Sequence, residues 1–138
     1  GAGVRRSTAR RRAFQLIEWM HLADKAHLPA RSLSAGDERR LGILRALAMK
    51  PRFILMDEPA AGLIEVESED LMQAIRRIRE WYGCGVLVIE HDMSLIMRLC
   101  ERVHVLDYGK TLCVGSPQKV QTDPSVITAY LGTDSGSG

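Results

Sequence analysis

The chain has 138 residues, of which 46% are hydrophobic and 26% are charged, and its formal net charge is +2. These values are ordinary for one soluble globular domain with a modest core. Three widely spaced cysteines with no Cys-x-x-Cys pair argue against a disulfide framework or a zinc site, and the longest apolar runs are too short for a membrane-spanning helix.

Charge is distributed unevenly along the chain. Residues 1–50 carry 11 basic and 4 acidic residues, whereas residues 51–138 carry 8 and 13. The arginines of residues 5–12 suggest either a nucleic-acid patch or a solvated helix end, and the absence of interleaved aromatic residues favours the second. We therefore expect residues 1–11 to be a basic tail or the start of a helix.

Two helices are predicted next. Residues 12–28 have an amphipathic pattern that ends at Pro29. A second helix begins near Ser34, a suitable N-cap, and has leucines at helical spacing. Gly36 would allow a ligand to approach its first turn, where free N–H groups and the helix dipole favour an anion. Phosphate is the anion that we expect there.

Two unbroken apolar runs follow, residues 53–56 and 86–89, and each ends in polar residues. Such runs are typical of parallel strands buried on both faces, whose carboxyl ends carry the chemistry. A third helix, beginning near Val66 with an inner stripe that includes Leu71 and Tyr82, connects them. One strand delivers Asp57 and Glu58 and the other His91, which suggests a nucleotide hydrolase.

The remaining residues predict a short helix, a hairpin and a closing helical segment. Residues 103–106 and 111–114 read as strands on either side of the turn signal Asp-Tyr-Gly-Lys. The preceding helix would turn Ile96, Met97 and Cys100 inward. Ser116-Pro117 begins the last helical segment.

Four motifs in this order resemble those of ABC transporter ATP-binding subunits, over residues 12–132. Leu-Ser-Ala-Gly-Asp (33–37) resembles the signature, Phe-Ile-Leu-Met-Asp-Glu-Pro (53–59) the Walker B strand, Ala-Ala-Gly-Leu (60–63) the D-loop, and His91 the switch histidine. Within the family, residues 58–63, 88–93 and 123–132 are most similar to the subunits of branched-chain amino acid importers.

The resemblance implies an α/β fold, a partial P-loop NTPase core with parallel strands flanked by helices and a C-terminal hairpin. No Gly-x-x-x-x-Gly-Lys-Ser/Thr loop occurs in the sequence. We therefore expect a C-terminal half without the Walker A half, nearly inactive by itself. Residues 12–50 would belong to the helical subdomain, residues 51–132 to the ATPase core and residues 133–138 to a disordered tail.

The resemblance also implies roles for single residues. Glu58 would be the general base, His91 would sense the γ-phosphate, and Asp57 would hold Mg²⁺ through water. ATP gripped by the opposite subunit would meet the signature, and the D-loop would line the same interface. Two departures stand out: Asp37 replaces the usual Gln, and Ile64 replaces an acidic or amide residue. The expected nucleotide-binding positions are Ser34, Ala35, Gly36, Asp37, Ala61, Gly62 and Leu63.

The implied partners are a second ATP-binding subunit and a transmembrane permease, on the cytoplasmic face of the inner membrane, with no nucleic acid. A missing phosphate-loop strand would expose strand edges, so the isolated chain is expected to form oligomers. Two alternatives remain. The chain could be a non-catalytic regulatory half-domain that associates with complete subunits, or a soluble ABC ATPase of DNA repair or translation.

Overall fold

The computed structural model describes residues 2–131, and the chain divides into two compact units. The first unit ends at Glu90 and the second begins at His91. The expected disordered tail at residues 133–138 lies outside the described residues. The boundary expected between the helical subdomain and the ATPase core, at residues 50 and 51, was placed from sequence motifs and not from compact units. It stays a proposal. No helix in the described part of the chain is long and apolar enough to cross a bilayer.

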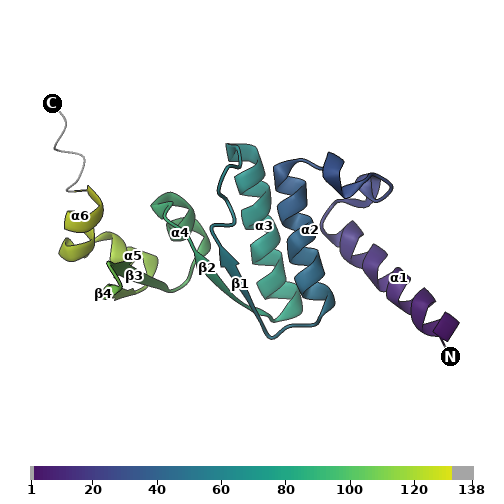
Figure 1. The fold of residues 1–138 in the computed structure, drawn as a ribbon. Helices are drawn as coiled ribbons and strands as arrows, with labels where there is room; N and C mark the ends of the chain where they lie inside the picture. The colour runs from purple at the N-terminus through teal and green to yellow at the C-terminus, as the bar shows by residue number, and fades with distance from the viewer. Residues whose placement is uncertain (1, 132–138) are drawn as a thin grey trace. The chain divides into compact units, whose positions relative to one another are not determined.

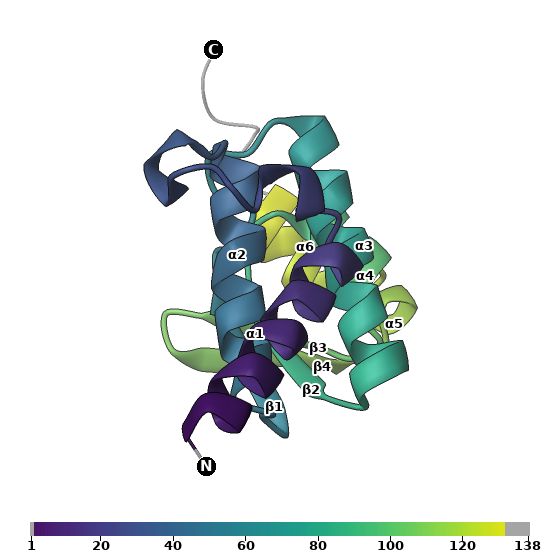
Figure 2. The same ribbon diagram turned by 90° about the vertical axis from the view of Figure 1, so that its right-hand side faces the viewer.

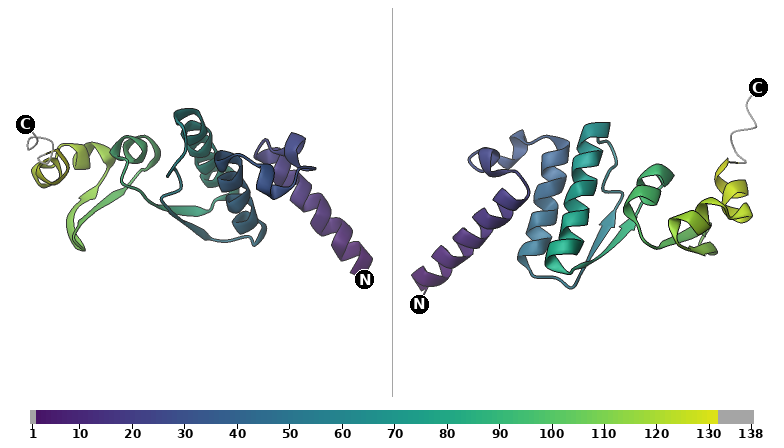
Figure 3. Two further views of the ribbon diagram at one scale, coloured as in Figure 1. Left: turned by 45° about the horizontal axis from the view of Figure 1, so that its top comes forward. Right: turned by 180° about the vertical axis from the view of Figure 1, so that it is seen from behind.

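The first unit combines three α-helices with a two-stranded parallel sheet (Figure 1). Helices α2 and α3 lie side by side and cover the same face of the sheet, as the two views of Figure 3 show. Its elements are α1 (Ala2–Trp19), the 3₁₀ turns η1 (Ala23–Lys25) and η2 (Ala30–Ser32), α2 (Ala35–Ala48), β1 (Phe53–Asp57), α3 (Glu65–Tyr82) and β2 (Gly85–Ile89).

Helix α1 differs from the helix predicted over residues 12–28. It begins ten residues earlier, because Arg and Ala favour a helix even without an apolar stripe. It ends at Trp19, where the Leu22 N–H donates to the Ile17 carbonyl at 3.0 Å and the His21 N–H donates to the Glu18 carbonyl at 3.0 Å. This is a Schellman ending with His21 left-handed at φ 55°. Figure 2 shows α1 beside α2, which it contacts.

The parallel pairing of β1 and β2 confirms the predicted sheet, in a register that pairs Leu55 with Leu87 and Asp57 with Ile89. Burial on both faces, however, was wrong. Ile54 and Met56 are buried under the helices, but Phe53, Leu55, Leu87 and Ile89 on the opposite face are 68%, 72%, 56% and 56% exposed. An unbroken apolar run makes both faces of a strand apolar. It does not show whether other elements of the same chain pack on both faces.

Helix α3 buries most of its predicted stripe. Leu71, Ile75 and Ile78 are buried, whereas Tyr82 stays 42% exposed and packs edge-on against Trp19 with ring centroids 5.2 Å apart. The α3 helix is therefore joined to the end of α1 as well as to α2.

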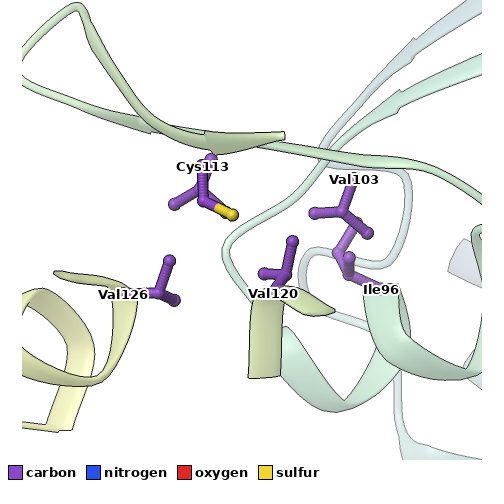
Figure 4. Packing of buried hydrophobic residues seen from close by; sticks show 6 residues of the cluster. Ile96, Val103, Cys113, Val120 and Val126 are labelled. Atoms are coloured by element: carbon purple, nitrogen blue, oxygen red, sulfur yellow. The ribbon is translucent and has the colours of Figure 1, made fainter. Parts of the chain in front are cut away.

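The second unit is built around the predicted hairpin. Tyr108 and Gly109 have φ of 44° and 77°, the left-handed pair of a tight turn between twisted strands. The hairpin residues Val103, Val105 and Cys113 pack against Ile96, Val120 and Val126 (Figure 4). The elements are α4 (Met93–Leu99), β3 (Val103–Asp107), β4 (Lys110–Gly115), α5 (Pro117–Gln121) and α6 (Pro124–Leu131).

Candidate functional site

The first turn of α2 is capped as the sequence predicts. The Ser34 hydroxyl oxygen accepts a hydrogen bond from the Asp37 N–H at 3.2 Å, and the Ser34 carbonyl accepts from the Glu38 N–H at 2.9 Å. Ser34 and Ala35 are exposed, whereas Gly36 is buried. This end of α2 therefore has the backbone amides and the positive dipole end that suit an anion.

Asp37 points into the protein rather than out of this turn. Only 2% of its side chain is exposed, and its carboxylate pairs with Lys25 from η1 and with Arg40 from the next turn of α2. Burial opposes ionisation, but the hydrogen bond from Lys25 and the charges of Arg40 and Lys25 outweigh it and hold the Asp37 pKa below its usual range. Any contact between this position and a nucleotide would therefore be made by the backbone of Asp37 and not by its side chain.

Arg40 extends this ion-pair cluster to the end of α1. Its Nη1 donates to the Met20 carbonyl at 3.4 Å, while Nη2 donates to Asp37. The cluster of Lys25, Asp37 and Arg40 thus ties three segments of the first unit together. The Asp37 side chain belongs to this cluster, and the nucleotide contact expected at this position stays a prediction.

Glu67 is a residue that sequence reasoning missed. Its Oε1 accepts from the Gly36 N–H at 3.3 Å and its Oε2 accepts from the Ile64 N–H at 3.4 Å. A Glu three residues after a helix N-cap is a known capping pattern, so the bond to Ile64 could have been predicted. The bond to Gly36 could not, since 31 residues separate the two positions.

The two candidate carboxylates lie at the carboxyl end of β1. Asp57 is the last residue of the strand and is exposed. Glu58 has φ 43°, uncommon for a residue with a side chain, and its N–H donates to the Ile89 carbonyl at 2.8 Å. The backbone of Glu58 is therefore fixed against the end of β2. Such strained positions cluster at active sites.

Glu90 adds a third carboxylate at the same edge, which sequence reasoning also missed. Its Oε1 accepts from the Ala60 N–H at 2.9 Å. Glu90 directly follows β2, so the general tendency of polar residues to gather at the carboxyl ends of parallel strands could have identified it. The bond holds the beginning of the D-loop against the end of β2.

The D-loop is a pair of tight turns. The Ala61 N–H donates to the Glu58 carbonyl and the Leu63 N–H to the Ala60 carbonyl, both at 3.1 Å, and Gly62 has φ 75°. Ala61 and Gly62 are exposed, Leu63 is half-buried, and Ile64 is 66% exposed. The loop therefore presents its backbone outward, next to the strand-end carboxylates.

His91 is exposed and is the first residue of the second unit. It follows β2 by two positions. Its expected meeting with Asp57 and Glu58 would span the two units and stays a prediction.

Asp57 suits a Mg²⁺ site of the kind in which one or two carboxylates bind the ion. No group of three or more His, Cys, Asp or Glu side chains within the described residues could hold a metal. Mg²⁺ in nucleotide sites is commonly bound by one or two carboxylates together with waters and substrate phosphates, so it needs no such cage. The exposed Asp57 would hold the ion through water, and the nucleotide would supply further ligands.

Two other histidines have structural partners. His21 Nε2 lies 2.6 Å from Arg77 Nη1, and His104 Nε2 lies 2.8 Å from Thr111 Oγ1. A small cavity of about 130 Å³ is lined by His21, Arg40 and Arg77, away from the strand ends. Neither feature belongs to the candidate site.

The sequence matches the models of two protein families. Residues 2–61 match the model of the ABC transporter family, and residues 110–135 match that of the branched-chain amino acid ATP-binding cassette transporter. The chain is 39% identical over 126 residues to LivG, a high-affinity branched-chain amino acid transport ATP-binding protein of Escherichia coli (91% of this chain, 49% of that protein). It is 43% identical over 118 residues to LptB, a lipopolysaccharide export system ATP-binding protein of Acidithiobacillus ferridurans (86% and 48%).

Solved structures agree with the sequence matches. The crystal structure of the ADP conformation of an ATP-binding cassette of an ABC transporter superposes with a TM-score of 0.82 and 27% identity, covering 91% of this chain and 50% of that one. The chain thus spans about half the length of the curated relatives that it matches. With the signature, Walker B and D-loop residues placed as described, this chain belongs to the family of ABC transporter ATP-binding proteins and is similar to those of branched-chain amino acid transport.

Proposed function

We propose that this chain is the signature-bearing part of an ABC ATPase subunit that energises import of branched-chain amino acids. The observation that carries the proposal is the joined carboxyl edge of β1 and β2. There the Glu58 N–H is bonded to the Ile89 carbonyl, and Asp57 is exposed beside it. A carboxylate held at the edge of a parallel sheet is well placed for hydrolysis of a nucleotide.

In the proposed reaction Glu58 accepts the proton of the attacking water while the nucleotide is held between two subunits. The hydrogen bond between the Glu58 N–H and the Ile89 carbonyl fixes the backbone position from which this carboxylate extends. Asp57 would hold Mg²⁺ through water, and the ion, when bound, would supply positive charge against the phosphates. His91 would hydrogen-bond the γ-phosphate. The backbone amides at Ser34–Gly36 would meet the γ-phosphate of ATP gripped by the opposite subunit.

The choice of branched-chain amino acids rests on two similarities. The model of the branched-chain family matches the C-terminal segment, and both LivG and BraF of Pseudomonas aeruginosa are named for this transport. Relatives named for lipopolysaccharide export and zinc import match at comparable identity, so the solute has to be tested directly.

The proposed partners are a second ATP-binding subunit and a permease on the cytoplasmic face of the inner membrane. The helical segment before the signature would contact the permease. The cluster of Lys25, Asp37 and Arg40 supports this route, since it ties η1 to the first turn of α2. Movement of the signature on ATP-driven dimer closure would then be passed to the permease through this connection.

The isolated chain is proposed to be nearly inactive and to self-associate. It contains no phosphate-loop sequence, so the amides and lysine that grip ATP would have to come from elsewhere. The open face of β1 and β2 presents four large apolar side chains, and the sheet edges offer unpaired backbone groups.

The test uses a complete subunit, in which a phosphate-loop segment precedes this chain, together with the permease. This assembly should hydrolyse ATP, and Glu58→Gln should lower kcat at least about 100-fold while ATP binding persists. Glu80→Gln, which changes an exposed carboxylate on α3, is the matched control and should leave kcat unchanged.

Uptake of labelled leucine into vesicles, with zinc and lipopolysaccharide transport as the competing readouts, identifies the solute. Wild-type turnover in the Glu58→Gln assembly would contradict the assigned base. ATP hydrolysis by the isolated 138-residue chain at the rate of the complete assembly would contradict the proposal that the phosphate-gripping groups lie outside this chain.

A further inference from the structure

The Glu67 carboxylate joins the first turns of two helices. One oxygen accepts from Gly36 in α2 and the other accepts from Ile64 at the beginning of α3. Helix N-termini attract anions, so one negative group serves two such ends at once. This arrangement places Glu67 between the signature and the D-loop.

At the α2 end, Glu67 fills the space beside Gly36. A Cβ at this glycine would lie 3.1 Å from each of Cβ, Cγ and Cδ of Glu67, so the side chain packs directly against the glycine backbone. The Gly36 N–H is therefore covered by a carboxylate oxygen. A phosphate oxygen that requires the same N–H cannot occupy that place until Glu67 moves.

At the α3 end, Glu67 supplies what the N-cap lacks. Ile64 occupies the N-cap position, and its side chain has no oxygen to accept from the first turn. The Ile64 N–H is held by Glu67 instead, immediately after the D-loop residues Ala61–Leu63. Displacement of Glu67 from Gly36 would therefore also change the support of the D-loop.

We propose that the Glu67 carboxylate takes the place of a phosphate at the N-terminus of α2 when no phosphate is bound there. When a phosphate displaces Glu67 from the Gly36 N–H, the bond from Glu67 to Ile64, next to the D-loop, changes as well. This inference rests on the proposed function, in which the Gly36 amide meets a phosphate. Glu67 is a positioning residue: it sets the availability of the Gly36 N–H and the conformation at Ile64, and takes no part in the chemical step.

The variant Glu67→Gln removes the charge and keeps one acceptor oxygen, so it can still satisfy the helix N3 position at Ile64 but no longer holds both N–H groups with separate oxygens. Glu65→Gln, which changes an exposed carboxylate in the same first turn of α3, is the matched control. In the 138-residue chain, inorganic phosphate is titrated while the Gly36 and Ile64 amide resonances are followed by NMR. With Glu67→Gln, half-saturation should occur at about two- to fivefold lower phosphate than with Glu65→Gln.

A second measurement uses the complete subunit in a Glu58→Gln background, where ATP-dependent dimer formation is followed by light scattering. Glu67→Gln should again lower the half-saturating ATP concentration about two- to fivefold relative to Glu65→Gln. The Ile64 amide should shift together with the Gly36 amide in the phosphate titration, since one side chain holds both.

Equal half-saturation in Glu67→Gln and Glu65→Gln, or a Gly36 amide that shifts while Ile64 does not, would overturn the inference. Absence of ATP-dependent dimers in the complete subunit would instead count against the proposed function. In that case the phosphate titration alone decides whether Glu67 covers the Gly36 amide.

Discussion

Lys25 and Asp37 form an ion pair in which the Asp37 side chain is almost completely buried, although the two residues lie 12 positions apart. Asp37→Asn keeps the shape and removes the charge. We expect it to lower the free energy of unfolding by about 1.5–3 kcal/mol, the usual contribution of a hydrogen bond to a charged group. Urea denaturation measures the change. Glu38→Gln, at an exposed neighbour, should have almost no effect.

The effect of Asp37→Asn should depend on pH. The Asp37 pKa is lowered from its ordinary value of 3.8 in the folded protein, so its charge stabilises the fold above about pH 3.8. The stability difference between wild type and Asp37→Asn should be constant near neutral pH and shrink as pH falls through the lowered pKa. A difference that grows in acid would contradict the ion pair.

Glu58 provides a test of backbone strain that is independent of catalysis. At φ 43° a side chain is disfavoured, so Glu58→Gly should be more stable than Glu58→Ala by about 1 kcal/mol. Both variants remove the carboxylate and should lack ATPase activity. At Glu65, the first residue of α3, the order should reverse, with Ala more stable than Gly. Thermal unfolding of the four variants measures both differences.

Ile64→Asp should stabilise α3 and raise turnover. An Asp at this N-cap can accept from the first turn of the helix, a gain of about 1 kcal/mol. In the complete subunit it restores an acidic residue to the D-loop, and we expect faster ATP hydrolysis. Val66→Asp is the control, because it adds the same charge to the first turn without reaching the N-cap position. A rate that stays unchanged in Ile64→Asp would contradict the D-loop role.

The open face of the sheet should drive self-association of the isolated chain. Leu55 and Leu87 are opposite each other in register and mostly exposed, so Leu55→Ser with Leu87→Ser should raise the dissociation constant of the dimer at least about tenfold. Met49→Ser removes a similarly exposed apolar group from the end of α2 and should have little effect. Light scattering over a range of concentrations measures both; a wild-type chain that stays monomeric throughout would refute the expectation.

Much of the fold was predictable because its signals are local. The Ser34 cap, the apolar runs of β1 and β2 and the turn before Lys110 each depend on a few neighbouring residues, and the structure has all three. The end of α1 was not predictable in this way. Its left-handed terminal residue is His21, where Gly is the usual signal.

The candidate site was predictable only in part, for a related reason. Asp57 and Glu58 were identified because they end a strand. The burial of Asp37 depends on Lys25, and the role of Glu67 depends on Gly36, and both are contacts between segments distant in sequence. A pattern within one segment carries no information about which distant side chain will meet it.

The close packing of Glu67 on Gly36 links the two positions in any variant library or in natural drift. Gly36→Ala would crowd the side chain at position 67, so it should be accepted more readily together with Glu67→Ala, which removes the contacts to Cγ and Cδ and leaves only the one to Cβ. Random mutagenesis of both codons, followed by selection for transport, should therefore return paired changes more often than either change by itself.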